Sequence, residues 1–171
     1  MNKRTRHITH AALIAAMYFA LTHMQNLLLP NTATWAIQFR ASEALCVLAL
    51  FTPAAIPGLT IGCLLFNISF AGALPLDFLV GALATFLACG SMRLLRRLPR
   101  FALAMPAIFN AVLVGWELTI YLGDTGFTMA AFWLNAIQVA IGELAVLYTL
   151  GWLLWRFLSK GGTANRMFRY N

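Results

Sequence analysis

Apolar runs follow one another along almost the whole of this 171-residue chain, and they limit the folds available to it. Hydrophobic residues make up 61% of the sequence and charged residues only 10%, against roughly 25% in a typical soluble domain. So little polar material cannot cover a surface that faces water. The sequence therefore predicts an all-α integral membrane protein that forms one domain over residues 1–171.

We divide the runs into six predicted transmembrane helices. They cover residues His10–Leu29, Ala36–Phe51, Ala54–Ala71, Leu76–Met92, Leu103–Leu122 and Met129–Phe157. The second is the weakest because its clean apolar stretch is short, so a tilted or partly re-entrant segment is an alternative. The first is about as long as a full span of roughly 20 residues and ends without an A-x-A-like site, so we expect it to be retained rather than cleaved.

The basic residues indicate the orientation of the chain. All but one of the 12 lysines and arginines lie in three blocks, Lys3–Arg6, Arg93–Arg100 and Arg156–Arg169. If six helices alternate in direction, all three blocks fall on one side, and the positive-inside rule makes that side cytoplasmic. Both termini are then expected in the cytoplasm, and the remaining basic residue, Arg40, lies on the outer side. This placement also argues against nucleic-acid binding, despite a net charge of +7.

Polar residues inside the apolar runs are the candidates for function. A charged side chain at the centre of a bilayer costs about 2.5–3.5 kcal/mol on insertion scales, so each carboxylate there needs a reason. Helical spacing places Arg40 and Glu43 on one face of their helix, and Asn110 and Glu117 on one face of theirs. The polar residues of the last span lie on one broad face of that helix. We expect these groups to converge on an outward-opening cavity between helices. The predicted substrate-binding residues are Arg40, Glu43, Asn67, Asn110, Glu117, Trp133, Asn135, Gln138 and Glu143.

Two interpretations of this polar set compete. Interhelical hydrogen bonds contribute only about 0.6 kcal/mol on average in a membrane, which is a modest return for burying a carboxylate. For Asn67 and Asn110 helix–helix bonding is as good an explanation as a ligand, but for Glu117 and Glu143 we favour a ligand. Trp133 fits an interfacial aromatic belt as well as it fits base stacking. Because carboxylates only accept hydrogen bonds and amides both donate and accept, a flat guanine-like base with an added amine suits the set.

Small residues form a second pattern. The first span contains two overlapping A-x-x-x-A pairs, from Ala11, Ala12, Ala15 and Ala16, and Gly58 and Gly62 form G-x-x-x-G at the start of the third span. Such spacing lets another helix approach closely, either a partner's or one of this chain's own.

Several signatures of catalysis and metal binding are missing from the sequence. It contains no G-x-x-x-x-G-K-[ST], H-E-x-x-H or G-x-S-x-G motif, so we predict neither nucleotide hydrolysis by that route nor an enzyme. The three histidines and the three cysteines, all of the latter inside apolar runs, show no zinc-ligand spacing. We therefore expect no metal and no cofactor.

Four segments, "IQFRASEAL", "AIPGLTIGCLLFN", "IFNAVLVGWEL" and "FWLNAIQVAIGELAVLYTLG", resemble the QueT family. These proteins are substrate-binding S components of energy-coupling factor (ECF) transporters, which are ABC-type importers, and are linked to uptake of queuosine precursors. The resemblance covers roughly Ile37 to Gly151. It implies a six-helix S component in a prokaryotic plasma membrane that binds a 7-deazaguanine, with the aminomethyl form preQ1 as the expected ligand.

The resemblance also implies partners, namely a transmembrane coupling subunit and two ATPases. In the family the coupling subunit is thought to contact an A-x-x-x-A face on the first helix, which Ala11 with Ala15, or Ala12 with Ala16, would supply here. One departure concerns residues 52–55, which read Thr-Pro-Ala-Ala where the family often has an acidic residue. The departure puts in doubt any role for a charge in that turn.

Other functions remain open at this stage. One is an S component for another vitamin, and another is a self-sufficient carrier driven by protons, with Glu117 or Glu143 relaying them. A membrane enzyme is the weakest alternative because no catalytic constellation is present. The sequence does not distinguish among the aminomethyl base, the nitrile base and queuine.

Overall fold

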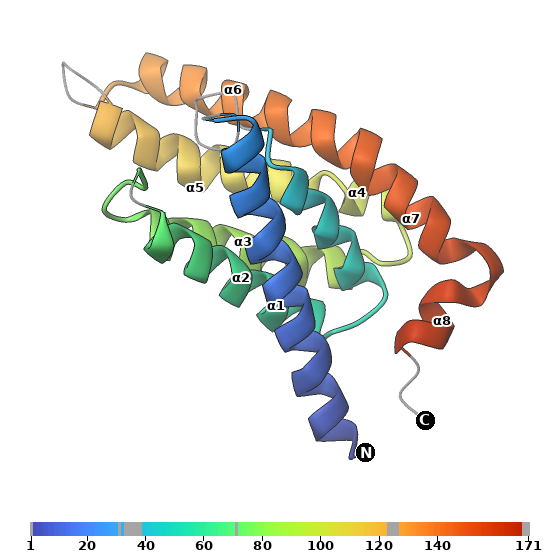
Figure 1. Ribbon diagram of the computed structural model, residues 1–171. Coiled ribbons are helices and arrows are strands. Elements are labelled where there is room, and N and C mark those ends of the chain that lie inside the picture. Colours follow the sequence, from blue (N-terminus) through green and yellow to red (C-terminus); the bar gives the residue numbers. More distant parts are fainter. Residues whose placement is uncertain (1, 31, 33–38, 71, 123–126, 169–171) are drawn as a thin grey trace.

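The computed structural model describes residues 2–30, 32, 39–70, 72–122 and 127–168, and its regular elements over these residues are all helical (Figure 1). The helices are α1 (Lys3–Leu28), η1 (Ala41–Leu50), α2 (Ala55–Ser69), α3 (Asp77–Leu94), α4 (Pro99–Ala102), α5 (Met105–Leu122), α6 (Met129–Val146), η2 (Leu147–Gly151), α7 (Trp152–Ser159), η3 (Lys160–Gly162) and α8 (Thr163–Phe168). The prediction of an all-α protein is confirmed.

Four stretches of the described chain are long and apolar enough to cross a membrane. They are Lys3–Leu28, Asp77–Leu94, Pro99–Tyr121 and Met129–Ser159. The helices η1 and α2 are also apolar but shorter. Each predicted span therefore corresponds to a helix or a run of helices, while the count of six membrane crossings stays a prediction.

The short helix η1 has the geometry of a 3₁₀ helix and lies in the interior. Eight of its ten residues are buried. At a rise of about 2.0 Å per residue, ten residues cover about 20 Å, less than the roughly 30 Å of hydrocarbon that a spanning helix must cross. This agrees with the alternative of a tilted or partly re-entrant second segment. Residues 33–38, which include the start of that predicted span, lie outside the described residues.

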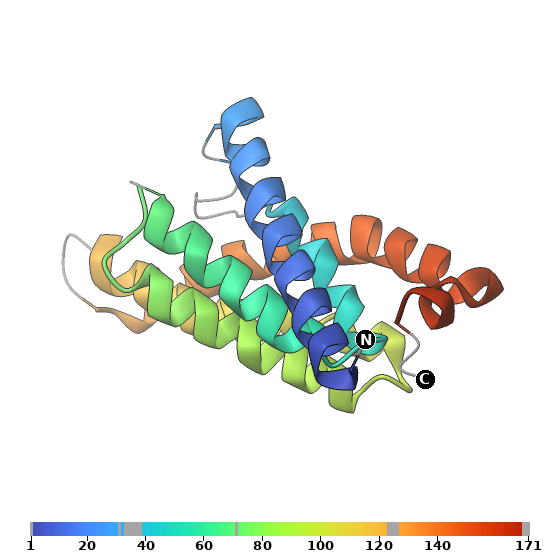
Figure 2. The ribbon, with the colours of Figure 1, turned by 60° about the horizontal axis from the view of Figure 1, so that its bottom comes forward.

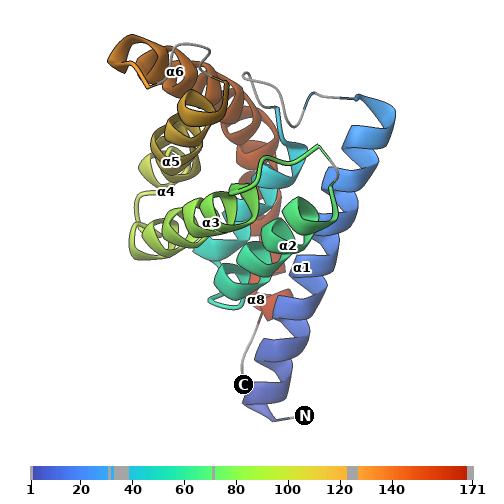
Figure 3. The same ribbon diagram turned by 90° about the vertical axis from the view of Figure 1, so that its left-hand side faces the viewer.

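The longer helices form a row that curves around η1. Along the row α1 packs on α2, α2 on α3, α3 on α5, and α5 on α6, while η1 contacts α1, α2, α3, α6 and α7 (Figure 3). The core around η1 is apolar and includes Val47 and Leu48 together with Tyr18, Leu59 and Met92 from the surrounding helices. Such an arrangement lets the polar residues of η1 meet polar residues from both ends of the row.

The glycine pair on α2 brings α1 and α2 into close contact. A Cβ atom on Gly58 would lie 2.7 Å from the carbonyl oxygen of Ala11, and one on Gly62 would lie 2.8 Å from that of Ala15. Both distances are far below an ordinary contact, so the two backbones can approach this closely only because both residues are glycine. The G-x-x-x-G motif is thus used for packing inside the chain.

The N-terminal and C-terminal parts of the chain lie toward one end of the molecule (Figures 1 and 2). The last predicted span is a helical run of 31 residues, Met129–Ser159, with a π-helical turn at η2 that packs on η1. After it, α8 turns back, and the ring of Phe168 meets His10 of α1 edge to face at 5.7 Å. The sequence analysis did not foresee α4 or α8, because four to six residues give no periodic signal.

Candidate substrate-binding site

The candidate site is a cluster of carboxylates around one arginine. Arg40 caps the start of η1 and is only 4% exposed. It interacts electrostatically with four carboxylates, which belong to Glu43, Asp77, Glu117 and Glu143. These are all the acidic residues in the described part of the chain; the fifth, Asp124, lies outside it. One guanidinium among four carboxylates leaves the cluster strongly acidic while the carboxylates are ionised.

The helix α1 fixes the position of Arg40. The side-chain oxygen of Gln25 accepts a hydrogen bond of 2.8 Å from the amide of Ala41, and its nitrogen donates to the carbonyl of Phe39. The backbone is therefore held on both sides of Arg40 by one side chain. Sequence analysis did not single out Gln25, because a polar residue near the end of an apolar run is common at the end of a helix and does not indicate a function.

Glu43 is buried and held by two donors. The Tyr18 hydroxyl donates to its Oε1 at 2.6 Å, and the Cys46 thiol donates to its Oε2 at 3.1 Å. Arg40 adds an electrostatic interaction, which is in line with the expected i, i+3 pairing. Tyr18 was also missed by the sequence analysis. The available signal was a single tyrosine in the middle of the first apolar run, whose hydroxyl needs a partner when it is buried.

Glu117 and Glu143 differ in how their oxygens are satisfied. Asn110 donates a hydrogen bond of 2.9 Å to Oε1 of Glu143, while Oε2 of Glu143 has no partner among the described residues. Glu117 is 0% exposed, and neither of its oxygens has a hydrogen-bond donor in the described part of the chain. Its strongest electrostatic neighbour is Asp77, another carboxylate, which lies close enough for a side-chain hydrogen bond when one of the two groups is protonated. Three buried carboxylate oxygens are thus available to a donor-rich ligand.

Asp77 reaches the cluster from the start of α3. Its Oδ2 accepts a hydrogen bond of 2.7 Å from the amide of Leu74, which fixes the turn before the helix. Asn67 of α2 donates to the backbone carbonyl of Asp77 at 2.7 Å. Asn67, a predicted site residue, therefore ties α2 to α3 and positions Asp77. The sequence analysis did not include Asp77 among the candidate site residues.

The remaining predicted site residues lie on α6 and are arranged differently. Asn135 is half-buried and donates to the hydroxyl of Thr119 on α5 at 3.0 Å, and Gln138 is also half-buried. Trp133 is 58% exposed, and its ring packs edge to face on Phe132 at 5.1 Å. The structure thus brings Asn135 and Gln138 to the inner side of α6 and leaves Trp133 on the outer surface, where it fits the aromatic-belt alternative.

A comparison with protein families shows to which family the chain belongs. The sequence model described as the QueT transporter matches residues 8–160. The chain belongs to the QueT transporter family. No curated protein and no solved structure matches it. The resemblance found in the sequence is therefore confirmed, and QueT membership together with four membrane-length helices supports a membrane transport protein for a small molecule rather than an enzyme.

The four alanines of the QueT α1 helix fall on two different faces. Ala15 is buried and Ala11 is partly buried, because they pack on the glycines of α2. Ala12 and Ala16 are exposed and line a groove of about 600 Å³ together with Ile61, Leu65 and Ile68 of α2. Ala15 also lines this groove, and Ala11 and Ala15 line a neighbouring one, but only Ala12 and Ala16 of the four are exposed.

Proposed function

We propose that this QueT protein is the substrate-binding S component of an ECF-type importer and that its ligand is a 7-deazaguanine with an aminomethyl group, such as preQ1. The observation that carries the proposal is Glu117, a fully buried carboxylate without a donor among the described residues. Burying a carboxyl group without hydrogen-bond partners is costly, so a protein that keeps one there is expected to supply those partners from a ligand.

The chemistry of a guanine-like base complements the cluster. Its Watson–Crick edge presents a ring N–H beside an amino group, and a carboxylate can accept both hydrogen bonds at once. Glu117 and the free oxygen of Glu143 are the acceptors we assign to that edge, with Asn135 and Gln138 completing the pattern and Asn110 holding Glu143. Asn67 supports the cluster through Asp77, as described above.

The excess of carboxylates supports a ligand that carries an amine. Four carboxylates surround Arg40, so a cationic aminomethyl group lowers the repulsion among them. The nitrile base has no such charge. Arg40 then either neutralises Glu43 or closes over the bound base, and both roles fit its position at the start of η1.

We further propose that the protein spans a prokaryotic plasma membrane six times with both termini in the cytoplasm. The basic blocks support this orientation, since the start of α1, the turn before α4 and the end of α7 lie toward one side of Figure 1, while the start of η1, which Arg40 caps, lies apart from them. The acidic site then lies toward the outer side, where an imported base arrives.

The proposed partners are a transmembrane coupling subunit and two ATPases, because the sequence contains no phosphate-binding loop of its own. We assign the docking surface to Ala12 and Ala16, since Ala11 and Ala15 are engaged with α2. The small side chains allow close approach of a partner helix at a place remote from the carboxylates.

Calorimetry on the purified full-length chain, with no nucleotide present, tests the ligand. We expect binding of the aminomethyl base, weaker binding of the nitrile base and guanine, and no binding of riboflavin. Riboflavin binding without a deazaguanine signal contradicts the proposal. Co-purification with an ATPase from the native membrane tests the partners.

A second candidate function is a self-sufficient carrier driven by protons. The buried carboxylate of Glu117 favours it, because a carboxylate without donors is suited to taking up a proton. Uptake by this chain alone in proteoliposomes under a proton gradient supports the carrier. Uptake that requires an added ATPase module supports the S component.

A further inference from the structure

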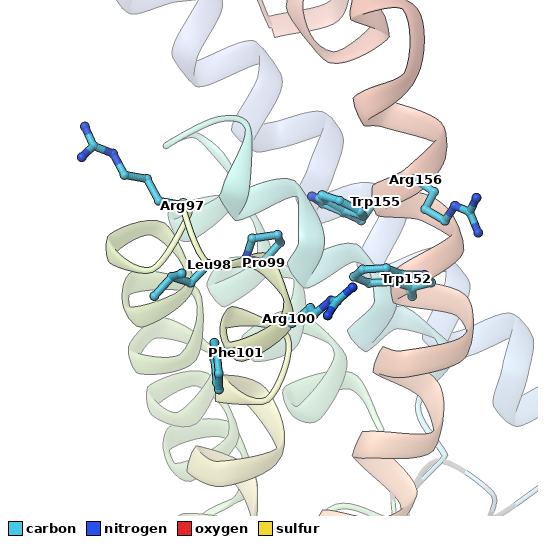
Figure 4. Close-up of a pocket in the computed structure, with 8 residues that line it drawn as sticks. All are labelled: Arg97, Leu98, Pro99, Arg100, Phe101, Trp152, Trp155 and Arg156. Atoms are coloured by element: carbon cyan, nitrogen blue, oxygen red, sulfur yellow. The ribbon is translucent and has the colours of Figure 1, made fainter.

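A cavity of about 470 Å³ lies among the basic residues of the second and third basic blocks (Figure 4), and no residue of the acidic cluster lines it. One wall is the segment before α5, and the other is α7. The side chains that matter to the argument are Arg97, Arg100 and Phe101 on the first wall and Trp152, Trp155 and Arg156 on the second. The Tyr148 hydroxyl donates to the carbonyl of Arg100 at 2.6 Å and so holds the two walls together.

The cavity carries positive charge that the described part of the protein does not neutralise. Arg97, Arg100 and Arg156 are exposed, and within the described residues none of them forms an ion pair. The four described carboxylates all lie around Arg40 in the other site. The described residues therefore hold no further acidic side chain that could pair with these guanidiniums.

The length of the last helical run places the cavity at the membrane surface. Its 31 residues extend for about 46 Å at 1.5 Å per residue, whereas the hydrocarbon layer is about 30 Å thick. Roughly the last ten residues then lie beyond the hydrocarbon, and they include Trp152, Trp155 and Arg156. Tryptophan and arginine are the residues that occupy this interfacial zone in membrane proteins.

The arrangement of the side chains fits a lipid with a charged head and an apolar body. The rings of Trp152 and Trp155 stack with centroids 4.7 Å apart and face the segment before α5, and Arg100 lies beside Trp152 (Figure 4). Arg97 and Arg156 point outward at the two sides of the cavity. A smaller cavity of about 200 Å³ is bounded by Arg100, Trp152 and Tyr148, and Tyr148 precedes Trp152 by about one helical turn.

We propose that this cavity binds the phosphate group of an anionic phospholipid, independently of the substrate site. Arg100 contacts the phosphate inside the cavity, Arg97 and Arg156 attract it at the rim, and the tryptophan rings and Tyr148 pack against the glycerol and upper acyl chain. Guanidinium groups are suited to this role because they bind phosphate through two parallel hydrogen bonds. Basic pockets between helices at a membrane surface are typical sites for anionic headgroups.

Native mass spectrometry of the full-length protein tests the proposal. The protein in detergent is titrated separately with phosphatidylglycerol and with phosphatidylcholine of the same acyl chains, and the fraction with bound lipid is measured. We expect phosphatidylglycerol to be retained preferentially. Arg100→Gln should lower its apparent affinity about tenfold, and Arg156→Gln about fivefold, since one interfacial arginine contributes about 1 kcal/mol and a charged hydrogen bond more.

Arg96→Gln is the matched control, because Arg96 is equally exposed in the same basic block but does not line the cavity. It should retain phosphatidylglycerol like the wild type, and thermal unfolding without lipid should confirm that all three variants are folded. Equal retention of the two lipids, unchanged retention by Arg100→Gln, or an equal loss in Arg96→Gln overturns the proposal. So does full competition by millimolar inorganic phosphate, which indicates a site for the free ion.

Discussion

Gln25 bonds to the backbone on both sides of Arg40, through the amide of Ala41 and the carbonyl of Phe39. Arg40, the one basic residue that the described part of the chain places among the four carboxylates, is thus positioned by a neutral side chain from α1. Since α1 also carries the proposed docking alanines, we expect a movement of this helix against a partner to shift Gln25 and, through its two hydrogen bonds, Arg40.

Replacing Gln25 should weaken substrate binding without removing any group that we assign to the ligand. Gln25→Leu removes both backbone hydrogen bonds, each with a net contribution of about 0.5–1.5 kcal/mol, so we expect a loss of roughly tenfold in affinity for the aminomethyl base. Gln25→Glu keeps the acceptor for Ala41 and should give a smaller loss. Met24→Ala, an exposed neighbour, is the control in the same calorimetric assay. Equal affinity in Gln25→Leu and wild type shows that the position of Arg40 does not depend on the two hydrogen bonds from Gln25.

Removing the Tyr18 hydroxyl should destabilise the protein. Tyr18→Phe keeps the buried ring but withdraws the donor from Oε1 of Glu43, and hydrogen bonds to charged groups contribute about 1.5–3 kcal/mol. We expect a lower melting temperature, with and without ligand. Tyr148→Phe is a matched control, because that hydroxyl bonds a neutral carbonyl at the same 2.6 Å and the residue is 44% exposed. A larger loss in Tyr148→Phe than in Tyr18→Phe contradicts the prediction.

The boundaries of the helices could be predicted where they coincide with a change in hydropathy. The last run begins at Met129, as predicted, and α3 begins one residue after the predicted Leu76. The first helix begins at Lys3 rather than His10, because a helix continues into water beyond the apolar segment that hydropathy detects. The 3₁₀ geometry of η1 could not be predicted, because its packing against six neighbouring elements, rather than local sequence, sets it.

The site could be predicted in part. Helical spacing and the rarity of charges in apolar runs singled out three glutamates that the structure buries, together with Arg40 and Asn110. That these residues bind a substrate stays a prediction. Helical spacing did not find Asp77, since the turn that brings it beside Glu117 is formed by contacts between α2 and α3 that no sequence period encodes. Nor did it separate the two alanine pairs, because both fit the same spacing and only the packing on Gly58 and Gly62 distinguishes them.

The two alanine pairs should respond differently to the same substitution. Ala12→Trp and Ala16→Trp place a large side chain on the exposed face, so we expect normal base binding by the purified protein but loss of uptake in cells. Ala15→Trp places the same side chain against Gly62 and should lower thermal stability instead. Uptake that survives Ala12→Trp and Ala16→Trp at normal expression shows that the coupling subunit docks elsewhere.

Glu117 and Glu143 should differ in a way that separates substrate recognition from structural support. Glu117→Gln replaces an acceptor with a donor opposite the donating edge of the base, so affinity should fall by roughly 10–100-fold. The same change should raise the melting temperature of the unliganded protein, because it removes a buried carboxyl group that has no donor among the described residues.

Glu143→Leu should instead lower the melting temperature, since it leaves the buried amide of Asn110 without its partner. Glu143→Gln keeps an oxygen for Asn110 and serves as the matched control for that loss. Calorimetry with the aminomethyl base and thermal unfolding without ligand measure the two effects on the same preparations. If Glu117→Gln binds the base as tightly as the wild type and unfolds at a lower temperature, Glu117 has a structural role, and the base is recognised by Arg40, Glu43 and the amides instead.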